Sequence, residues 1–252
     1  MRTAHHSLVV VVAALAVAAS PPASGANYSP GKTAQAAAPA AKPKKAKHAP
    51  GEEIFDNKTV LPIRIEISAS ELAVLRRDDK KDVRATVWEG TNKFLDVGVH
   101  VKGAAGSRRP IDDAKPALTL NFQRFTPEQR FHGLRKIHLN NSVQDSSYLT
   151  ENICSELYRK AGVPTPRVSY ANVELNGKKR GLYVLKEGFS KEMLSIYFKH
   201  THGNLYDGGF LREITEPLAH EAAGADDVKD WSDLKALVKA AQTPNPVNAS
   251  MS

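Results

Sequence analysis

The feature that most constrains this fold is a β-hairpin, which the sequence predicts at residues 168–187. Two runs rich in β-branched, aromatic and other apolar residues, VSYANVEL and RGLYVLKE, flank the tetrapeptide NGKK. The Asn176–Gly177 pair supplies the positive φ angles that a tight turn between antiparallel strands requires. The chain must therefore build an antiparallel sheet, and its other segments must supply further strands and the helices that cover them.

Those further elements are visible as changes in hydrophobic period. Alternating apolar residues predict strands, and apolar residues at helical spacing predict helices. Further strands are predicted at residues 60–67, 83–88, 94–102, 117–122 and 135–141, and helices at residues 68–76, 145–160, 191–199 and 230–241. Ser68 and Glu71 have the spacing of a capping box, and residues 145–147 offer N-caps for the second helix. The order of elements predicts an α+β fold.

The N-terminal residues 1–25 have the three-part pattern of a secretory signal peptide. A positive start precedes an apolar run at residues 8–19, and small-residue cleavage sites follow at 16–18 and 23–25. The apolar run is too short to span a bilayer comfortably. We therefore expect cleavage and export to the periplasm, the cell envelope or the extracellular space; the alternative is an uncleaved N-terminal anchor.

Residues 26–58 read as a disordered linker, because Ala, Pro and Lys dominate and few branched apolar residues are present to offset chain entropy. The first 50 residues carry six Lys or Arg and no Asp or Glu, so the net charge of +8 leaves only +2 for the remainder. The high isoelectric point is thus mostly a property of the leader, and no nucleic-acid partner is expected. The basic run of the linker either touches an anionic surface or is a solvated spacer.

A folded domain is expected at residues 59–242, followed by a tail at 243–252. Cys154 is the single cysteine, so the chain forms no internal disulfide and has no Cys-x-x-Cys metal site. Its position on a predicted helix beside Leu157 and Ala161 favours a small buried apolar side chain over a reactive thiol. Neither H-E-x-x-H nor G-x-S-x-G occurs, so two common hydrolase motifs are excluded.

Residues 99–109, VHVKGAAGSRR, could hold an anion. Gly103 and Gly106 would let backbone N–H groups approach a phosphate closely, Ser107 adds a hydroxyl donor, and Arg108 adds a two-pronged charge. The segment is neither a Walker A loop nor the G-x-G-x-x-G loop of ordinary protein kinases. The alternative is a plain β-turn.

Three charged residues extend this candidate site. Lys115 precedes the strand at 117–122, and Glu151 lies on the helix after LNNSVQDSS. A nucleotide-binding enzyme needs a cation near the phosphates and often a carboxylate that orients it, so we expect these two residues to form such a pair. Ordinary surface charges are the alternative. Glu187 ends the apolar strand GLYVLKE, which could present backbone groups to a purine edge.

Several segments together resemble one family. VKGAAGSRRPIDDAKPALTLNF, then the blocks LNN…D, AGVP.PR and LNG…GLYVL.E, and then GNLYDGG occur in an order that is similar to the spore coat protein H (CotH) kinase family over about residues 60–209. The resemblance implies an atypical protein-kinase-like fold that binds ATP with Mg or Mn and phosphorylates Ser or Thr on proteins. Family members occur in spore coats and as exported proteins, so a protein substrate or an envelope or coat protein is the expected partner. The oligomeric state is left open.

The resemblance also assigns roles to residues. It implies catalytic roles for Lys115, Glu151 and Asp145, with Asn141 and Asp145 in the LNN…D block. It implies nucleotide-binding roles for Gly103, Gly106, Ser107, Arg108, Lys115 and Glu187, and it assigns no metal ligand.

The sequence departs from the family pattern after GNLY. The expected aspartate, His-Asn-Tyr stretch and Trp-Asp-x-Asp motif do not occur before Ser252, and DDVKDW at residues 226–231 has the wrong order. We therefore expect a C-terminally incomplete kinase-like domain with impaired phosphotransfer, because these motifs would supply the base and the metal ligands. The alternatives are a non-catalytic pseudokinase or an envelope- or spore-coat-binding module, and, more remotely, an unrelated carbohydrate- or envelope-binding α+β domain.

Overall fold

The computed structural model describes residues 49–56, 58–104, 106–199, 201, 205–207, 219–221 and 231–242. The predicted signal peptide at 1–25, most of the predicted linker and the tail at 243–252 lie outside these residues. The part of the chain that is described contains no helix long and apolar enough to cross a membrane.

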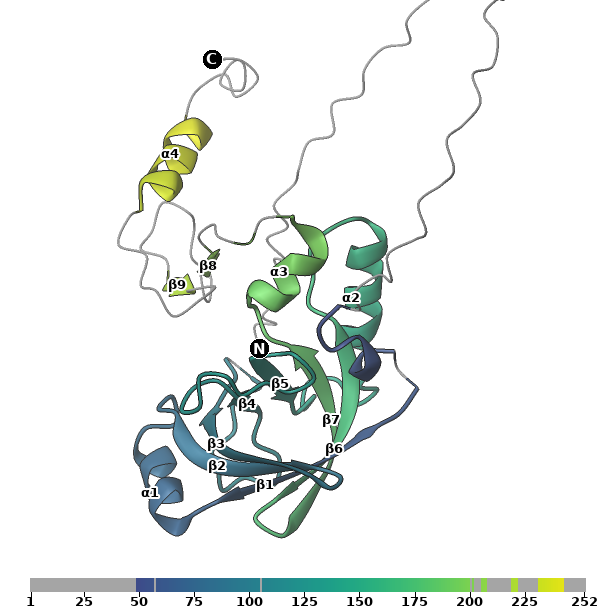
Figure 1. The fold of residues 1–252 in the computed structure, drawn as a ribbon, viewed down its shortest axis with the longest axis vertical. Coiled ribbons are helices and arrows are strands. Elements are labelled where there is room, and N and C mark those ends of the chain that lie inside the picture. The colour runs from purple at the N-terminus through teal and green to yellow at the C-terminus, as the bar shows by residue number, and fades with distance from the viewer. Residues whose placement is uncertain are drawn as a thin grey trace, which may run out of the picture. The chain divides into compact units, whose positions relative to one another are not determined.

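Seven strands form a closed barrel in the order β1-β2-β3-β4-β5-β7-β6 (Figure 1). They are β1 (Leu61–Ile67), β2 (Val83–Glu89), β3 (Asn92–Val101), β4 (Leu118–Asn121), β5 (Lys136–Asn140), β6 (Val168–Leu175) and β7 (Lys178–Glu187). Six of the seven contacts are antiparallel, and the parallel pairing of β1 with β6 closes the barrel. The predicted hairpin is confirmed as β6–β7, with φ of 47° at Asn176 and 73° at Gly177.

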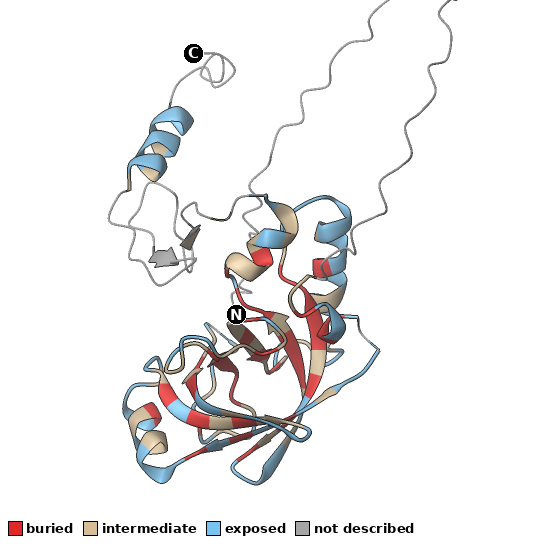
Figure 2. Cartoon of the chain, viewed as in Figure 1, coloured by how far each residue is buried: buried red, intermediate tan, exposed pale blue. Residues whose placement is uncertain are grey.

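The alternation of the strands places their apolar residues inside the barrel. In β1, Ile63, Ile65 and Ile67 are buried, whereas Arg64 and Glu66 are exposed. Buried apolar residues of the other strands complete one core cluster, and Figure 2 shows the buried residues concentrated along the barrel strands. Each fully buried large aliphatic side chain stabilises the fold by about 1.5–3 kcal/mol, so this interior dominates the stability of the domain.

Helices connect and flank the strands. They are α1 (Ala69–Arg77), α2 (Thr150–Lys160), α3 (Lys191–Tyr197) and α4 (Ser232–Ala241); β8 (Leu205–Asp207) and β9 (Ala219–Glu221) form a separate two-stranded sheet. The predicted cap of α1 is confirmed, since the Ser68 hydroxyl accepts from the Glu71 N–H at 3.3 Å. A closed barrel with few helices is compatible with a kinase-like α+β fold and with other architectures, so that assignment stays a prediction.

The predicted linker is wrong at its C-terminal end. Residues Glu52–Ile54 form a 3-10 helix, and Ile54 and Phe55 are buried in the barrel's core cluster. The guanidinium of Arg167 packs over the Phe55 ring at 4.7 Å and donates to the Pro50 carbonyl at 2.5 Å. The two adjacent apolar residues give this polar segment enough surface to bury, so the folded region begins before residue 59.

The prediction of a buried cysteine is also wrong. Cys154 is exposed, and so are its helix neighbours Ile153 and Leu157, at 59% and 65%. The residue of α2 that is buried is Ser155, whose hydroxyl donates to the Pro166 carbonyl at 2.7 Å. The helix therefore turns a different face toward the barrel from the one that its apolar spacing predicts.

Candidate functional site

A cavity of about 560 Å³ opens where β3 and β5 end and α2 begins. Its lining comes from the residues after β3, the end of β5 and the loop to α2: Lys102, Gly103, Ala104, Ser107, Ala117, Asn140, Asn141, Ser142, Val143, Gln144, Asp145, Thr150 and Glu151. Five of the residues that the sequence analysis singles out, Gly103, Ser107, Asn141, Asp145 and Glu151, are among them. The cavity thus gathers the glycine-containing loop, the LNN block and the helix carboxylate at one place.

A chain of three polar side chains crosses this cavity. The ammonium of Lys102 donates to Asn140 Oδ1 at 2.5 Å, and Asn140 Nδ2 donates to both oxygens of Glu151 at 2.7 and 2.6 Å. The Asn140 amide therefore links the lysine after β3 to the first-turn glutamate of α2. Each hydrogen bond has one charged member, and such bonds are the stronger kind in proteins.

A second lysine faces the same carboxylate. Lys186, on β7, has its ammonium 3.7 Å from Glu151 Oε2. Burial, and then the positive charge of Lys186, lowers the pKa of Lys102 to about 8. Two ammonium groups thus lie around one carboxylate, with Lys102 held half-buried at the cavity wall. This local excess of positive charge suits an anionic ligand.

The loop after Lys102 depends on a glycine. Gly103 has a φ of 123°, and a Cβ atom there would lie 2.8 Å from Arg108 Cα. The loop turns back through hydrogen bonds from the N–H groups of Ser107 and Arg108 to the Ala104 carbonyl, at 3.2 and 3.0 Å. The buried amide of Asn141 then donates to the carbonyls of Ser107 and Lys115 at 3.0 and 2.9 Å. Asn141 therefore has a positioning role for this loop.

Asp145 lines the cavity, but its carboxylate is already occupied. Oδ1 accepts from the Ser147 hydroxyl at 2.5 Å, and Oδ2 accepts from the Thr150 N–H at 2.9 Å. These bonds lower the pKa of Asp145 to about 2, with the Ser147 hydroxyl as the largest cause. The carboxylate closes the turn before α2, so the helix begins at Thr150 rather than at residue 145, where the sequence predicts it.

The expected pair of Lys115 and Glu151 is replaced by a different arrangement. Lys115 does not line the cavity; its ammonium donates to the Tyr148 hydroxyl and lies over the Tyr148 and Tyr183 rings at 4.4 and 5.3 Å. Aromatic faces attract a cation, and the loop before β4 directs Lys115 toward them. Glu151 instead has Asn140 and Lys186 as its partners.

Three further predicted residues lie outside the lining. The exposed Arg108 pairs with Asp79 at 2.5 Å, and Gly106, with a φ of 86°, backs onto the Gln144 side chain. Glu187 is fully buried and pairs with Arg167 at 2.7 Å. Its carboxylate links the end of β7 to the residue before β6, so Glu187 has a structural role.

The sequence reading missed Lys102, Asn140 and Lys186. A signal was present for Lys102, because a lysine directly before the first glycine of the loop stands at the end of an alternating strand. Asn140 belongs to the LNN block, but the family resemblance points to its neighbour Asn141. Lys186 is 35 residues from Glu151 in sequence, and only the closure of β7 against β5 brings the two together.

The described residues offer little for a metal ion. No group of three or more His, Cys, Asp or Glu side chains that could hold a metal occurs in the described part of the chain. The two carboxylates that line the cavity, Asp145 and Glu151, already have hydrogen-bond partners.

Known proteins resemble this chain in the same region. The family model for the CotH kinase protein matches residues 99–250. Inner spore coat protein H of Bacillus subtilis (strain 168) is 27% identical over 142 residues, which cover 55% of this chain and 37% of that protein. The matched region therefore represents well under half of the length of that relative.

Proposed function

This chain belongs to the CotH kinase protein family, and from that premise we propose that its cavity binds ATP for phosphoryl transfer to Ser or Thr of a protein. The observation that carries the proposal is the Lys102–Asn140–Glu151 chain beside the Gly103 loop. Phosphoryl transfer depends on positioning and on neutralising charge, and these residues provide a held cation and a loop that can approach phosphate closely.

Each residue has a definite task in this proposal. Lys102 and Lys186 neutralise phosphate oxygens, and Glu151 holds both ammonium groups near the cavity through Asn140 and by direct attraction. Gly103, which has no side chain, lets the phosphates approach the main chain of the loop closely, and Ser107 lines the same cavity. Mg or Mn, when bound with the nucleotide, supplies further charge neutralisation, and its ligands are not assigned among the described residues.

The location and the partner follow from the family relative. The relative in Bacillus subtilis is named an inner spore coat protein, so we propose a coat or envelope location and a coat or envelope protein as substrate. The predicted signal peptide supports export to that location. N-terminal sequencing of the exported protein tests the idea, and recovery of intact Met1 from a soluble cytoplasmic fraction would count against it.

A second function is favoured by one observation. Both carboxylates that line the cavity, Asp145 and Glu151, are engaged by neighbouring donors. A chain with this cavity can bind nucleotide without transferring phosphate, as a pseudokinase that engages a coat or envelope partner.

ATP binding to the whole chain tests the nucleotide proposal. Lys102→Ala should weaken binding by about 10- to 100-fold, because a charge-assisted hydrogen bond contributes about 1.5–3 kcal/mol. Lys115→Ala is the matched control, since that ammonium lies against tyrosines outside the cavity. The proposal is contradicted if calorimetry shows that Lys115→Ala weakens ATP binding and Lys102→Ala does not. That result would favour Lys115, the residue that the sequence predicts, as the lysine that binds phosphate.

A further inference from the structure

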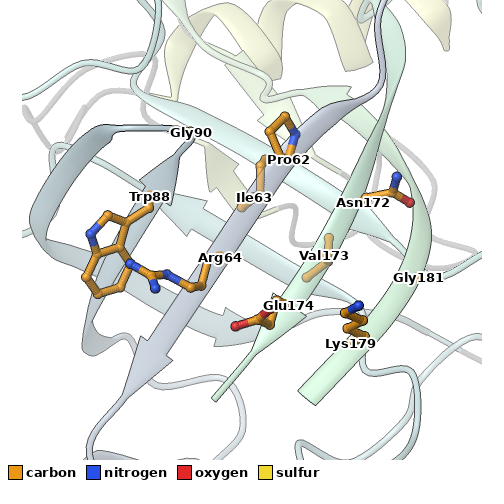
Figure 3. A pocket seen from close by; sticks show the side chains of 10 residues that line it. All are labelled: Pro62, Ile63, Arg64, Trp88, Gly90, Asn172, Val173, Glu174, Lys179 and Gly181. Carbon is orange, nitrogen blue, oxygen red and sulfur yellow. The ribbon is translucent and has the colours of Figure 1, made fainter. Parts of the chain in front are cut away.

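A second hollow, of about 650 Å³, lies on the wall of the barrel (Figure 3). It is lined by Pro62, Ile63, Arg64, Trp88, Gly90, Asn172, Val173, Glu174, Lys179 and Gly181. These residues belong to β1, β2, β6 and β7 and to the turn after β2, and none of them lines the nucleotide cavity. The hollow is therefore a separate feature of the surface.

Strand register places four of its side chains in one row. Arg64 is opposite Trp88 of β2 on one side and opposite Glu174 of β6 on the other, and Glu174 is opposite Lys179 of β7. Their neighbours Ile63 and Val173 are buried in the barrel, so the row points outward. Adjacent strands are about 4.8 Å apart, which separates the strand positions of Arg64 and Lys179 by about 10 Å.

Arg64 is held in a defined orientation. Its guanidinium carbon lies 4.1 Å from the centre of the Trp88 ring, and the ammonium of Lys93 lies 5.4 Å from the same point. Stacking occupies the flat face of a guanidinium and leaves the N–H donors at its edge available. An ordered arginine loses less entropy when it binds a carboxylate, so the row contains a preorganised anion-binding fork.

A second arginine in this protein stacks on an aromatic ring and also pairs with a carboxylate. Arg84 lies over the Phe125 ring at 4.1 Å, and its guanidinium pairs with Asp96 at 3.0 Å. Arg64 has the same kind of stacking, yet no hydrogen bond or ion pair to its guanidinium is found among the described residues. Arg84 thus has a carboxylate partner within the fold. Arg64 can bind a carboxylate of another molecule in the same way.

Two glycines of the lining face open space. Gly90 and Gly181 have φ angles of 56° and 79°, and a Cβ atom at either position would meet nothing within 4 Å. The β6–β7 register shifts between Val173 and Glu174, so Arg180 is an extra residue in β7. Bulges of this kind alter the direction of a strand, and here one adjoins Gly181 at the rim. Exposed backbone at the rim leaves room for the main chain of a bound peptide.

The charge of the hollow selects the ligand. Arg64 and Lys179 line it with one carboxylate, Glu174, between them, and Lys93 adds a third positive charge at the Trp88 ring. We propose that the hollow binds an acidic peptide segment of a partner protein, with one carboxylate on the edge of Arg64 and another at Lys179. Because Glu174 repels a negative group in the middle of the row, the two acidic residues are separated by uncharged ones.

A nucleic acid fits this surface less well. Binding to a phosphate backbone needs several regularly spaced cations, and its affinity falls steeply with salt. The hollow offers three cations and a central carboxylate, which suits two separated anionic groups. Duplex DNA is accordingly a competitor in the test.

The test measures fluorescence anisotropy of a labelled, capped peptide of Gly and Ser with two Glu residues three positions apart, titrated with the whole chain and without nucleotide. We expect saturable binding that weakens at least tenfold when both Glu are replaced by Gln. Arg64→Ala should weaken it at least tenfold, and Arg64→Lys by less, since the charge stays and the fork is lost. Arg84→Ala, the stacked arginine already paired with Asp96, and Lys102→Ala should leave the affinity unchanged.

Three results would overturn the proposal: equal affinity for the Glu and Gln peptides, normal binding by Arg64→Ala, or duplex DNA that displaces the peptide and itself requires Arg64. Arg64→Gln removes the charge but keeps part of the aliphatic stem beside Trp88, so it replaces the alanine variant if melting shows that the latter is unfolded. The readout needs no ATP, so failure of the nucleotide proposal would leave this result unaffected.

Discussion

At the scale of single residues, the surroundings of the Lys102 ammonium would make the proposed nucleotide binding depend on pH. Burial lowers the pKa of Lys102 to about 8, so this lysine loses its charge at a pH where an exposed lysine keeps it. A neutral amine attracts phosphate weakly. We therefore expect the ATP affinity to fall as the pH rises from 7 to 9, and Lys102→Arg, which stays charged, should flatten this dependence. Calorimetry across that range checks it; an unchanged slope in Lys102→Arg would assign the titration to another group.

The buried pair of Arg167 and Glu187 makes a prediction about stability. Their side chains are 5% and 0% exposed and form hydrogen bonds at 2.7 and 2.9 Å. Removing one member leaves an uncompensated buried charge, so Arg167→Ala should lower the free energy of unfolding by about 3–5 kcal/mol. Arg108→Ala is the control, because its pair with Asp79 is largely exposed on the arginine side and should contribute about 1 kcal/mol or less. Urea denaturation compares the two, and similar midpoints would argue against a structural role for Glu187.

At the scale of elements, the segment before β1 is attached to the barrel by a histidine between two acids. His132 contacts Glu53 at 2.6 Å and Glu89 at 2.9 Å. Burial alone would lower the pKa of His132, but the hydrogen bonds and charges of Glu89 and Glu53 together raise it above its usual value. The ion pair is thus complete below about pH 6.5, the ordinary histidine pKa, and is lost as the pH rises through the higher folded pKa.

This attachment should therefore loosen in mildly alkaline solution. We expect the thermal midpoint to fall as the pH rises above about 6.5 in the native chain and to change less in His132→Gln, whose amide does not titrate. His132→Ala should also cost about 1–3 kcal/mol at pH 6, since Glu89 loses its imidazole partner in a half-buried position. Calorimetric melting at several pH values is the measurement, and a slope that survives in His132→Gln would place the titration elsewhere.

The elements were mostly readable from sequence, and their mutual arrangement was not. All seven barrel strands were located from sequence, and the alternation is clearest in β1, where Ile63, Ile65 and Ile67 are buried between exposed residues. Nothing local encodes the parallel contact of β1 with β6 that closes the barrel, since it joins residues more than 100 positions apart. Gly103 and Ser107 could be placed in a site from loop chemistry, whereas Lys102 and Lys115 could be told apart only by the tyrosines that hold Lys115.

At the scale of the whole molecule, the two proposed functions, binding of nucleotide and binding of a partner peptide, belong to two different surface features. The cavity proposed for nucleotide lies where β3 and β5 end, and the hollow proposed for an acidic peptide lies on the wall formed by β1, β2, β6 and β7. They share no lining residue but are parts of one closed sheet. A partner protein held by its acidic segment would stay close to the cavity, which raises its effective concentration there.

Phosphoryl transfer is the measurement that separates a kinase from a nucleotide-binding module. We expect this 252-residue chain to transfer little or no labelled γ-phosphate to a Ser/Thr-rich protein with Mg or Mn, while ATP binding persists. The reason is that the motifs expected to supply the base and the metal ligands do not occur in the sequence, and the two carboxylates that line the cavity, Asp145 and Glu151, are held by neighbouring donors. Lys102→Ala is the control, because it should abolish whatever transfer occurs. Rapid transfer that depends on Lys102 would show that other carboxylates of the chain supply the metal site, and the account of a binding module would then be wrong.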